Sequence, residues 1–409
     1  MNDPATPSIV VMTRNMYLGA DVDRVIAALS GSSEEDPQAA LEAVLQEFIA
    51  TDPPTRLNAL AGEIARFRPH VVGLQEVSGL SVNLPPEFGV PPFQTDFLAG
   101  LMQALAARGL SYQVITNQNF RFSLFGGAIV LQDSDALLID SRLPILSSAG
   151  ATFSCGQLCI PLPGLGTLKR GWVRARTQFS GRTVTFVSTH PESGEEPRIA
   201  QLRAGQMQEL MGLLQTVEEP IVLMGDLNDT PGSAMHQVVT GAGFVDVWAS
   251  LRPSHPGYTC CHATHLQSGS FDHRIDYVMV RGGFLNGTGR VVRGAKVQIV
   301  GESSDERIQG AFGLIWPSDH GGVVVTLPPA QTLIDPHRPS STIFDHAPSC
   351  SQGPGLLAHL HPLASAGPHH QTAGAGLSLA ARDTAPGGGR LCPADAGVQP
   401  GRRDGHVAG

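Results

Sequence analysis

The chain has no long apolar run and no excess of basic charge. None of its apolar stretches approaches the roughly 18 residues that a helix needs to cross a bilayer, and the N-terminus MNDPATPSIVVMTRN lacks the basic segment and following apolar stretch of an export signal. The formal net charge of −9 gives no long-range field that would draw the whole molecule onto nucleic acid or an anionic membrane, although a local basic patch stays compatible with it. These absences favour a cytoplasmic protein without a membrane span.

Cysteine is also scarce. Six cysteines in 409 residues are too few for a disulfide scaffold, which favours reduced thiols in the cytoplasm. Cys155 and Cys159, and the adjacent Cys260 and Cys261, are close enough in sequence to leave their disulfide state open. An extracellular location remains open if the true start lies upstream.

What the chain does contain, up to residue 328, is an alternation of helical and strand patterns. The segments SIVVMTRN, PHVVGLQEV, YQVIT, GGAIVL, RIDYVMV, VVRGAKVQIV and GGVVVTL are typical of strands. GWVRARTQFS and RTVTFVSTH alternate apolar and polar residues around Ser180-Gly181, which predicts an antiparallel hairpin. Leu57 to Phe67, Phe97 to Ala107 and Met207 to Leu214 have helical spacing. Hairpins mixed with helix-linked strands predict an α/β fold of two packed mixed sheets flanked by helices.

The composition changes after Pro328. Residues 329–409 are dominated by Ala, Gly, Pro, Ser and His and contain a single aromatic residue, Phe344. Such a segment cannot bury enough apolar surface to offset its ordering entropy. The sequence therefore predicts a globular domain over 1–328 and a low-complexity, disordered tail over 329–409.

Several predicted strands give way to polar residues at one end. Strand ends on one side of a sheet meet in space, so polar residues there can form one pocket. The stretch IVLMGDLNDTPGS at 221–233 is an example, because its apolar run leads into a polar segment. The strand-end segments are Thr13-Arg14-Asn15, Gln75-Glu76, Ser188-Thr189-His190, Asp226-Leu227-Asn228, Asp276 in RIDY, and Ser318-Asp319-His320.

Each of these segments alone is weak evidence, since a single strand-end Asn or Asp is usually a turn former. Together and in this order they resemble the endonuclease/exonuclease/phosphatase superfamily over residues 8–328. The resemblance implies the deoxyribonuclease-I-like fold, a four-layer α/β/β/α sandwich. The matching pieces are RN at Asn15, QEV at Glu76, STH at His190, GDLN at Asp226 and Asn228, RIDY at Asp276, and SDH at Asp319 and His320.

The resemblance also implies metal-dependent hydrolysis of a phosphoester. Glu76 is expected to be the first Mg²⁺ ligand, with Asn15 and Asp319 completing the shell, because Mg²⁺ is commonly bound through one or two carboxylates. Mn²⁺ is an expected substitute. Tyr17 stands where the abasic-site branch of the family has an acidic residue, and the nearest acid, Asp21, is predicted to open a helix. One metal ion is therefore expected.

The remaining residues are expected to act on the water and the phosphate. Asp226 would orient the attacking water and accept its proton, and Asn228, on the same strand face two residues later, would donate a hydrogen bond to the phosphoryl group. His190 and His320 would bind phosphoryl oxygens, with Asp276 orienting the His320 ring. A second possibility is that the pair of Asp276 and His320 takes the proton of the water.

Two rival interpretations remain. CCHATH at 260–265 supplies Cys260, Cys261, His262 and His265 as imaginable zinc ligands, although adjacent cysteines rarely fit one tetrahedral site. The other rival is a binding protein that keeps the fold without catalysis. The absence of a GxSxG motif disfavours a serine hydrolase.

The substrate class stays open among nucleic acid, phospholipid headgroup and small phosphorylated metabolite. The net charge disfavours nucleic acid, and the loops 78–95 and 150–169 are expected to set specificity. The sequence gives no oligomeric state.

Overall fold

The computed structural model describes residues 7–31, 33–154, 160–162 and 166–328. The chain divides into two units, residues 1–339 and 340–409, and every described residue belongs to the first. The predicted tail over 329–409, and the cysteines Cys155 and Cys159, lie outside the described residues.

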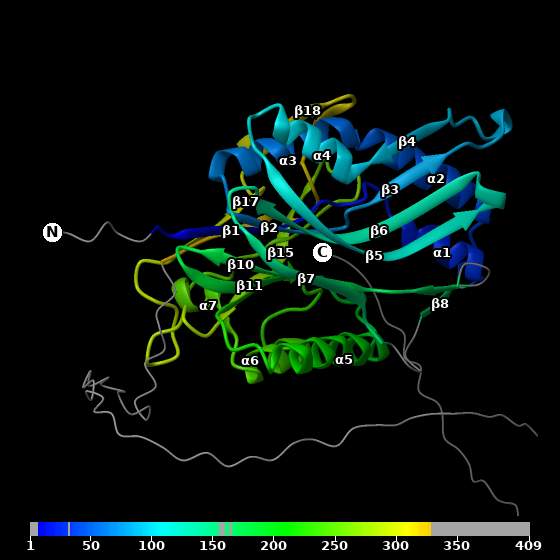
Figure 1. Ribbon diagram of the computed structural model, residues 1–409. Coiled ribbons are helices and arrows are strands. Elements are labelled where there is room, and N and C mark those ends of the chain that lie inside the picture. Colours follow the sequence, from blue (N-terminus) through cyan, green and yellow to red (C-terminus); the bar gives the residue numbers. More distant parts are fainter. Residues whose placement is uncertain (1–6, 32, 155–159, 163–165, 329–409) are drawn as a thin grey trace, which may run out of the picture. The chain divides into compact units, whose positions relative to one another are not determined.

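Within the first unit, two β-sheets pack face to face and helices cover their outer faces (Figure 1). The helices on the first sheet are α1 (Val22–Ser30), α2 (Pro37–Ala50), α3 (Pro53–Phe67) and α4 (Phe97–Ala106). Those on the second sheet are α5 (Pro197–Leu214) and α6 (Ala234–Gly241), and the short α7 (Val247–Leu251) contacts β16 and β17. This is the predicted four-layer sandwich.

The first sheet has eight strands, seven of them in the order β17-β20-β1-β2-β6-β3-β4, with β5 paired to β6. Its strands are β1 (Ile9–Asn15), β2 (Val71–Gln75), β3 (Gly79–Val82), β4 (Phe93–Asp96), β5 (Tyr112–Leu124), β6 (Ile129–Asp140), β17 (Lys296–Val300) and β20 (Gly322–Leu327). Both β20 and β6 run antiparallel to the central pair β1 and β2, which is parallel.

The second sheet has six strands in the order β13-β16-β12-β11-β10-β7. They are β7 (Ile145–Thr152), β10 (Gly171–Phe179), β11 (Arg182–His190), β12 (Ile221–Asp226), β13 (Val245–Asp246) and β16 (Asp276–Arg281). β10 and β11 form the predicted antiparallel hairpin, with Gly171 opposite His190. The two-stranded pairs are β8 (Ile160–Leu162) with β9 (Gly166–Leu168), β14 (Cys260–His262) with β15 (Gly269–His273), and β18 (Ile308–Gly310) with β19 (Gly313–Ile315).

Three layers of apolar side chains separate these elements. One lies between α1 to α4 and the first sheet, one lies between the two sheets, and one lies between the second sheet and α5 and α6. Strands β2 and β12 are buried along their whole length, as their uninterrupted apolar sequences predict.

Two glycines let the strands that carry the site approach closely. A Cβ on Gly225 would lie 2.1 Å from the carbonyl oxygen of Thr189 on the neighbouring strand. A Cβ on Gly73 would lie 3.1 Å from Cβ of Met224, on the facing sheet. Gly225 in LMGDLN therefore lets β11 and β12 lie close together within the second sheet, and Gly73 in VVGLQ lets the two sheets approach each other.

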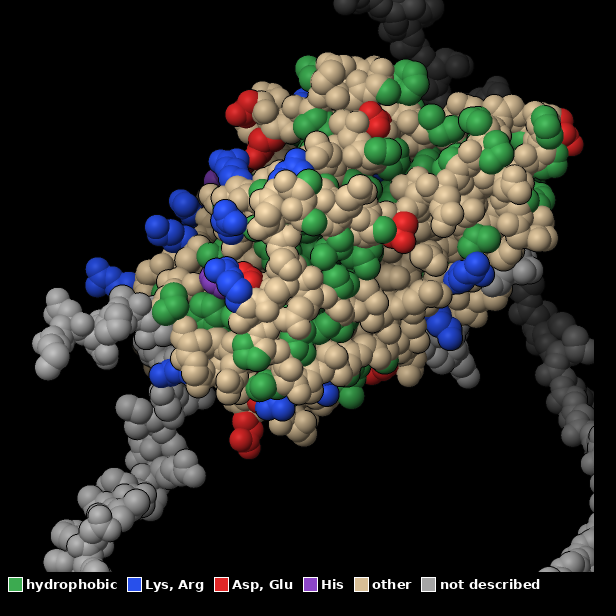
Figure 2. Space-filling view, turned by 45° about the horizontal axis from the view of Figure 1, so that its top comes forward, with side chains coloured by type: hydrophobic (Ala, Val, Ile, Leu, Met, Phe, Trp, Pro, Cys, Tyr) green, Lys and Arg blue, Asp and Glu red, His purple; other side chains and the backbone are tan. Residues whose placement is uncertain are grey.

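On the face drawn in Figure 2, hydrophobic side chains reach the surface in the middle and basic side chains gather mainly toward one side. Among the described residues, no helix has both the length and the apolar composition that crossing a bilayer requires.

Candidate active site

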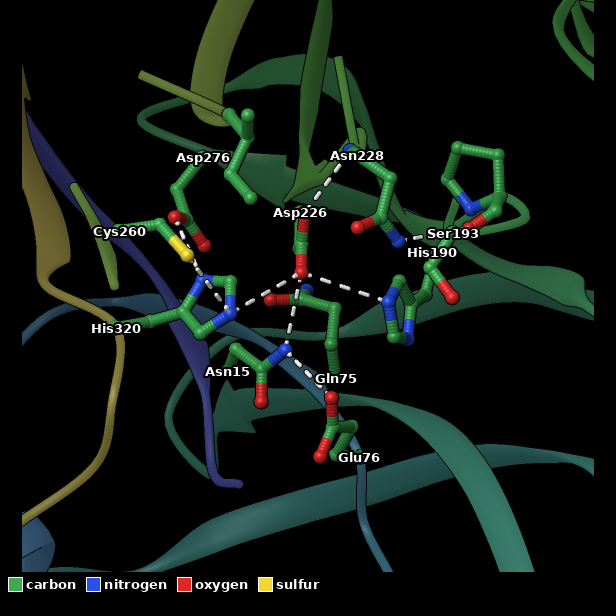
Figure 3. A network of polar contacts seen from close by, with 12 residues as sticks. Asn15, Gln75, Glu76, His190, Ser193, Asp226, Asn228, Cys260, Asp276 and His320 are labelled. Carbon is green, nitrogen blue, oxygen red and sulfur yellow. Dashed lines mark hydrogen bonds and ion pairs between the residues drawn. The ribbon is translucent and has the colours of Figure 1, made fainter. Parts of the chain in front are cut away.

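The polar strand ends meet at one edge of the sandwich, as predicted. The amide group of Asn15, at the end of β1, connects the two sheets, because its Nδ2 lies 3.0 Å from Glu76 Oε1 and 3.0 Å from Asp226 Oδ2 (Figure 3). Its Oδ1 accepts the backbone N–H of Tyr17 at 2.8 Å. Asn15 therefore presents a donor to both carboxylates, and its role as a metal ligand stays a prediction.

Asp226 lies at the centre of the network. Its Oδ2 is 3.4 Å from His190 Nε2 and 3.7 Å from His320 Nε2, and its Oδ1 accepts the backbone N–H of Asn228 at 2.9 Å. Only 1% of the residue is exposed. Burial raises the pKa of Asp226 to about 7, although the charge of the His320 ring lowers it. A carboxylate with such a pKa can accept a proton near neutral pH.

His320 is held as a charged ring. Its Nδ1 lies 2.9 Å from Asp276 Oδ2. Asp276 on β16 lies directly opposite Asp226 on β12, so His320 contacts two paired residues of the second sheet. Burial lowers the pKa of the His320 ring, but the carboxylates of Asp276, Asp226 and Asp319 together outweigh it and raise this pKa well above its usual value. Since Nδ1 donates to Asp276, the protonated Nε2 faces Asp226.

His190 is held as a neutral ring. Burial lowers its pKa well below the usual value, and the charges of Arg170 and His320 lower it further. Nη1 of Arg170 lies 3.2 Å from His190 Nδ1. A guanidinium can only donate, so Nδ1 must accept and the ring proton must be on Nε2. The neutral His190 thus directs an N–H toward Asp226.

Asn228 reaches the site by a different route from the one predicted. Strand β12 ends at Asp226, and Asn228 has φ +53°, so the two residues are not on one face of an extended strand. The polypeptide turns immediately after Asp226, and the Asp226 carboxylate accepts the Asn228 N–H within that turn. Nδ2 of Asn228 donates to the carbonyl oxygen of Pro191 at 3.0 Å, next to His190.

Glu76 and Asp319 lie on the wall of one pocket. Glu76 follows β2 with φ +52°, and its Oε2 accepts the backbone N–H of Leu18 at 2.9 Å. Burial raises the pKa of Asp319 to about 6, the His320 charge lowers it, and the Glu76 charge raises it. Two partly buried, mutually repelling carboxylates with an amide beside them are a donor set that suits a hard divalent cation.

A second group of possible ligand atoms is also close together. One ligand atom each from Asp226, Asp276 and His320 lies within 4.8 Å of the others. In this group the charged His320 ring already contacts both carboxylates. The imidazolium therefore occupies the position that a cation would need.

The residues of the zinc alternative do not assemble. The sulfur atoms of Cys260 and Cys261 contact each other, and they form a group of possible ligand atoms with His320 that does not include His262 or His265. The His262 ring nitrogens face the carbonyl oxygens of Gly269 and Gly301 at 3.2 and 3.0 Å. His265 is exposed, and its ring nitrogens contact only nearby residues of its own loop. Cys260 Sγ instead lies 3.7 Å from His320 Nε2.

Several residues that hold this network were not predicted. Arg170 connects His190 to Glu192, whose Oε1 is 3.1 Å from Arg170 Nε. The hairpin pattern contained a signal, because it pairs Gly171 with His190 and so places the preceding Arg170 at that strand end. Arg56 has no comparable signal. It is buried in α3 and donates to the carbonyl oxygens of Met16 and Pro317, on the two segments that carry Asn15 and Asp319.

Residues 47–320 match the model of the endonuclease/exonuclease/phosphatase family. No curated protein matches the chain. An endonuclease/exonuclease/phosphatase from Beutenbergia cavernae shares 20% identity with it over 79% of this chain and 72% of that chain, with a TM-score of 0.48. A family protein from Leptotrichia buccalis shares 17% identity over 78% of this chain and 99% of that chain, with a TM-score of 0.47. The human Nocturnin catalytic domain shares 17% identity over 78% of this chain and 94% of that chain, with a TM-score of 0.46.

Proposed function

Because the chain belongs to the endonuclease/exonuclease/phosphatase family, whose membership supports phosphoester hydrolysis, we propose that it is a Mg²⁺-dependent phosphoesterase acting by in-line attack of water. The observation that carries the proposal is the central position of Asp226. This buried carboxylate, with a pKa of about 7, is surrounded by a charged imidazole, a neutral imidazole and the amide of Asn15.

Glu76, Asp319 and Asn15 would hold the metal ion. Members of this family generally use divalent ions, and the two carboxylates on the pocket wall suit Mg²⁺, with Mn²⁺ as a substitute. When bound by these residues, the ion would supply positive charge to neutralise the phosphoryl oxygens.

Asp226 takes a proton from the water as the water oxygen bonds to phosphorus. The bond between phosphorus and the ester oxygen breaks, and the departing alcohol oxygen takes a proton from solvent. His320 and His190 donate to the phosphoryl oxygens, and Asp276 keeps the His320 ring oriented and charged. Asn228 is a further donor at this site, and its backbone N–H fixes the Asp226 carboxylate.

Hydrolysis of bis-p-nitrophenyl phosphate tests the proposal. We expect activity to be lost on chelation and restored by Mg²⁺ or Mn²⁺. Restoration by Zn²⁺ alone would return the zinc alternative. Absence of hydrolysis with any divalent ion and any phosphoester would support a binding protein on the same fold.

A panel of substrates separates the open classes. Single-stranded DNA, RNA, a phospholipid and inositol phosphates should be compared at one metal concentration, with chromatographic separation of the hydrolysis products as the readout. A substrate preference of at least about tenfold in kcat/KM, equivalent to about 1.4 kcal/mol of transition-state binding, would assign the class.

A further inference from the structure

A pocket of about 290 Å³ opens beside the candidate active site. Glu76, Asp319, Arg170 and Ser193 line the end of the pocket nearest the network. The remainder extends between helices α1 and α2 and strands β5 and β6. Its volume lies just below the range of roughly 300 to 1,000 Å³ that small-ligand sites occupy. The pocket is thus continuous with the place where a phosphoester would be hydrolysed.

The pocket wall away from the catalytic residues is mainly aliphatic. Val25, Ile26 and Leu29 on α1 face Val44 and Leu45 on α2 across it. The strands add Phe122, Leu124, Ile129 and Leu131. Such side chains provide contact area but no donors or acceptors for the edge of a nucleobase. The wall therefore suits an apolar chain better than a base.

The charges on the pocket wall restrict the polar part of the ligand. Asp21, Asp23 and Asp133 line the pocket together with Glu76 and Asp319, and Arg170 is the single basic residue among the lining side chains. A second phosphate group would be repelled by this set of carboxylates. The ligand should therefore carry one phosphate, positioned at the catalytic network.

We propose that this pocket binds an alkyl or acyl chain of the substrate, so that the substrate is an amphiphilic phosphoester with a single phosphate group. The inference rests on the proposed phosphoesterase function and specifies its substrate class. The proposal places the determinants of specificity in residues 18–48 and 120–131, which form most of the apolar wall. The loops 78–95 and 150–169, which the sequence favoured for this role, contribute only a small part of the wall.

A chain-length series tests the proposal. Methyl, butyl and octyl p-nitrophenyl phosphates share one leaving group and differ only in the alkyl ester, and each can be assayed below the concentration at which it self-associates. Each buried methylene should raise kcat/KM about threefold to fourfold. Octyl has seven methylenes more than methyl, so full burial should raise kcat/KM by on the order of 10³- to 10⁴-fold, with KM carrying much of the change.

Two tryptophan variants on the same helix locate the effect. Ile26→Trp fills the pocket and should remove the octyl advantage while the methyl ester is hydrolysed as before. Arg24→Trp is the matched control, because Arg24 is exposed on α1 and does not line the pocket. Its chain-length dependence should equal that of the unaltered protein.

Rates that are equal across the series in the unaltered protein would overturn the proposal, as would a higher kcat/KM for thymidine 5′-p-nitrophenyl phosphate than for the octyl ester. If no ester is hydrolysed, the phosphoesterase assignment fails separately, and calorimetric binding of octyl phosphate against methyl phosphate decides the question of the pocket. Tighter octyl binding that Ile26→Trp abolishes supports the pocket, and equal binding of the two phosphates overturns it.

Discussion

The two imidazoles of the site are the same residue type in the same degree of burial, yet they are held in opposite charge states. His190 is 2% exposed and His320 is 6% exposed, and each directs Nε2 toward the same oxygen of Asp226. His190 has the guanidinium of Arg170 behind it, whereas His320 has the carboxylate of Asp276. Burial lowers the pKa of both rings, but Arg170 and His320 lower the His190 pKa further, whereas Asp276, Asp226 and Asp319 raise the His320 pKa.

This difference gives the site one neutral and one charged donor. A charged donor to a phosphoryl oxygen forms the stronger hydrogen bond, because charge-assisted bonds are roughly twice as strong as neutral ones. The comparison also explains why Asp226 remains a usable base, since a second imidazolium beside it would lower its pKa further.

The largest effect is expected from the residue that both rings share. Asp226→Asn removes the proton acceptor and should lower turnover of bis-p-nitrophenyl phosphate by on the order of 10²- to 10⁴-fold, with Tm nearly unchanged. Asp272→Asn makes the same chemical change at an exposed position on β15 and should leave turnover as it is. Near-normal turnover in soluble Asp226→Asn protein would remove Asp226 from the mechanism.

The next effect separates the two rings. His320→Gln should lower kcat by on the order of 10²- to 10³-fold, because it removes a charged donor to the phosphoryl group. His190→Gln should lower kcat by about tenfold, because the lost donor is neutral. Equal losses in the two variants, measured with saturating Mg²⁺, would contradict the assignment of opposite charge states.

The pH dependence of stability tests the same assignment without catalysis. His190 stays neutral in the folded protein, whereas in the unfolded chain the residue takes up a proton below about pH 6.5. His190 therefore lowers the free energy of unfolding as pH falls. Folded His320 stays charged, so its contribution is complete below about pH 6.5 and is lost as pH rises through its raised folded pKa.

These signs predict different Tm profiles in metal-free protein. Relative to the unaltered protein, His190→Gln should gain Tm progressively as pH falls below about 6.5, and His320→Gln should lose most Tm at low pH and least at high pH. Parallel difference curves for the two variants would show that the rings share one charge state.

The smallest effect is expected at Cys261. Cys261 is exposed. The hydrogen bond to the His320 ring comes from the neighbouring residue, Cys260. Cys261→Ser should change Mg²⁺-restored kcat/KM by about twofold or less, as for most surface substitutions. A loss of bound zinc together with activity would instead revive the cysteine and histidine cluster as a metal site.

The sequence contained enough information for the layers and the strand ends. Period-two alternation predicted the hairpin of β10 and β11, and the buried runs predicted β2 and β12, because burial is recorded directly in the pattern of apolar residues. The resemblance of the ordered motifs then indicated which strand ends carry chemistry. Elements without such a pattern, including the short β13 and the pair of β18 and β19, were not predicted.

Some contacts depend on segments that are distant along the chain. Arg170 and Arg56 do not belong to any strand-end motif, and they reach the site through contacts with His190 and Met16. Cys260 lies against His320 because the first residue of β14, Cys260, pairs with His320 in the segment before β20. Contacts of this kind arise only when the sheets are packed.

By itself the sequence predicted that two mixed sheets pack together, and it gave the order of the polar strand ends along the chain and the residue types that can bind a metal ion and a phosphate, since these follow from local periodicity and side-chain chemistry. Only the tertiary structure decided that His190 is neutral and His320 charged, that Asn15 joins the two carboxylates, and that an aliphatic pocket adjoins them. The physical reason is that charge state and pocket shape depend on which distant groups surround a side chain and how completely they exclude water.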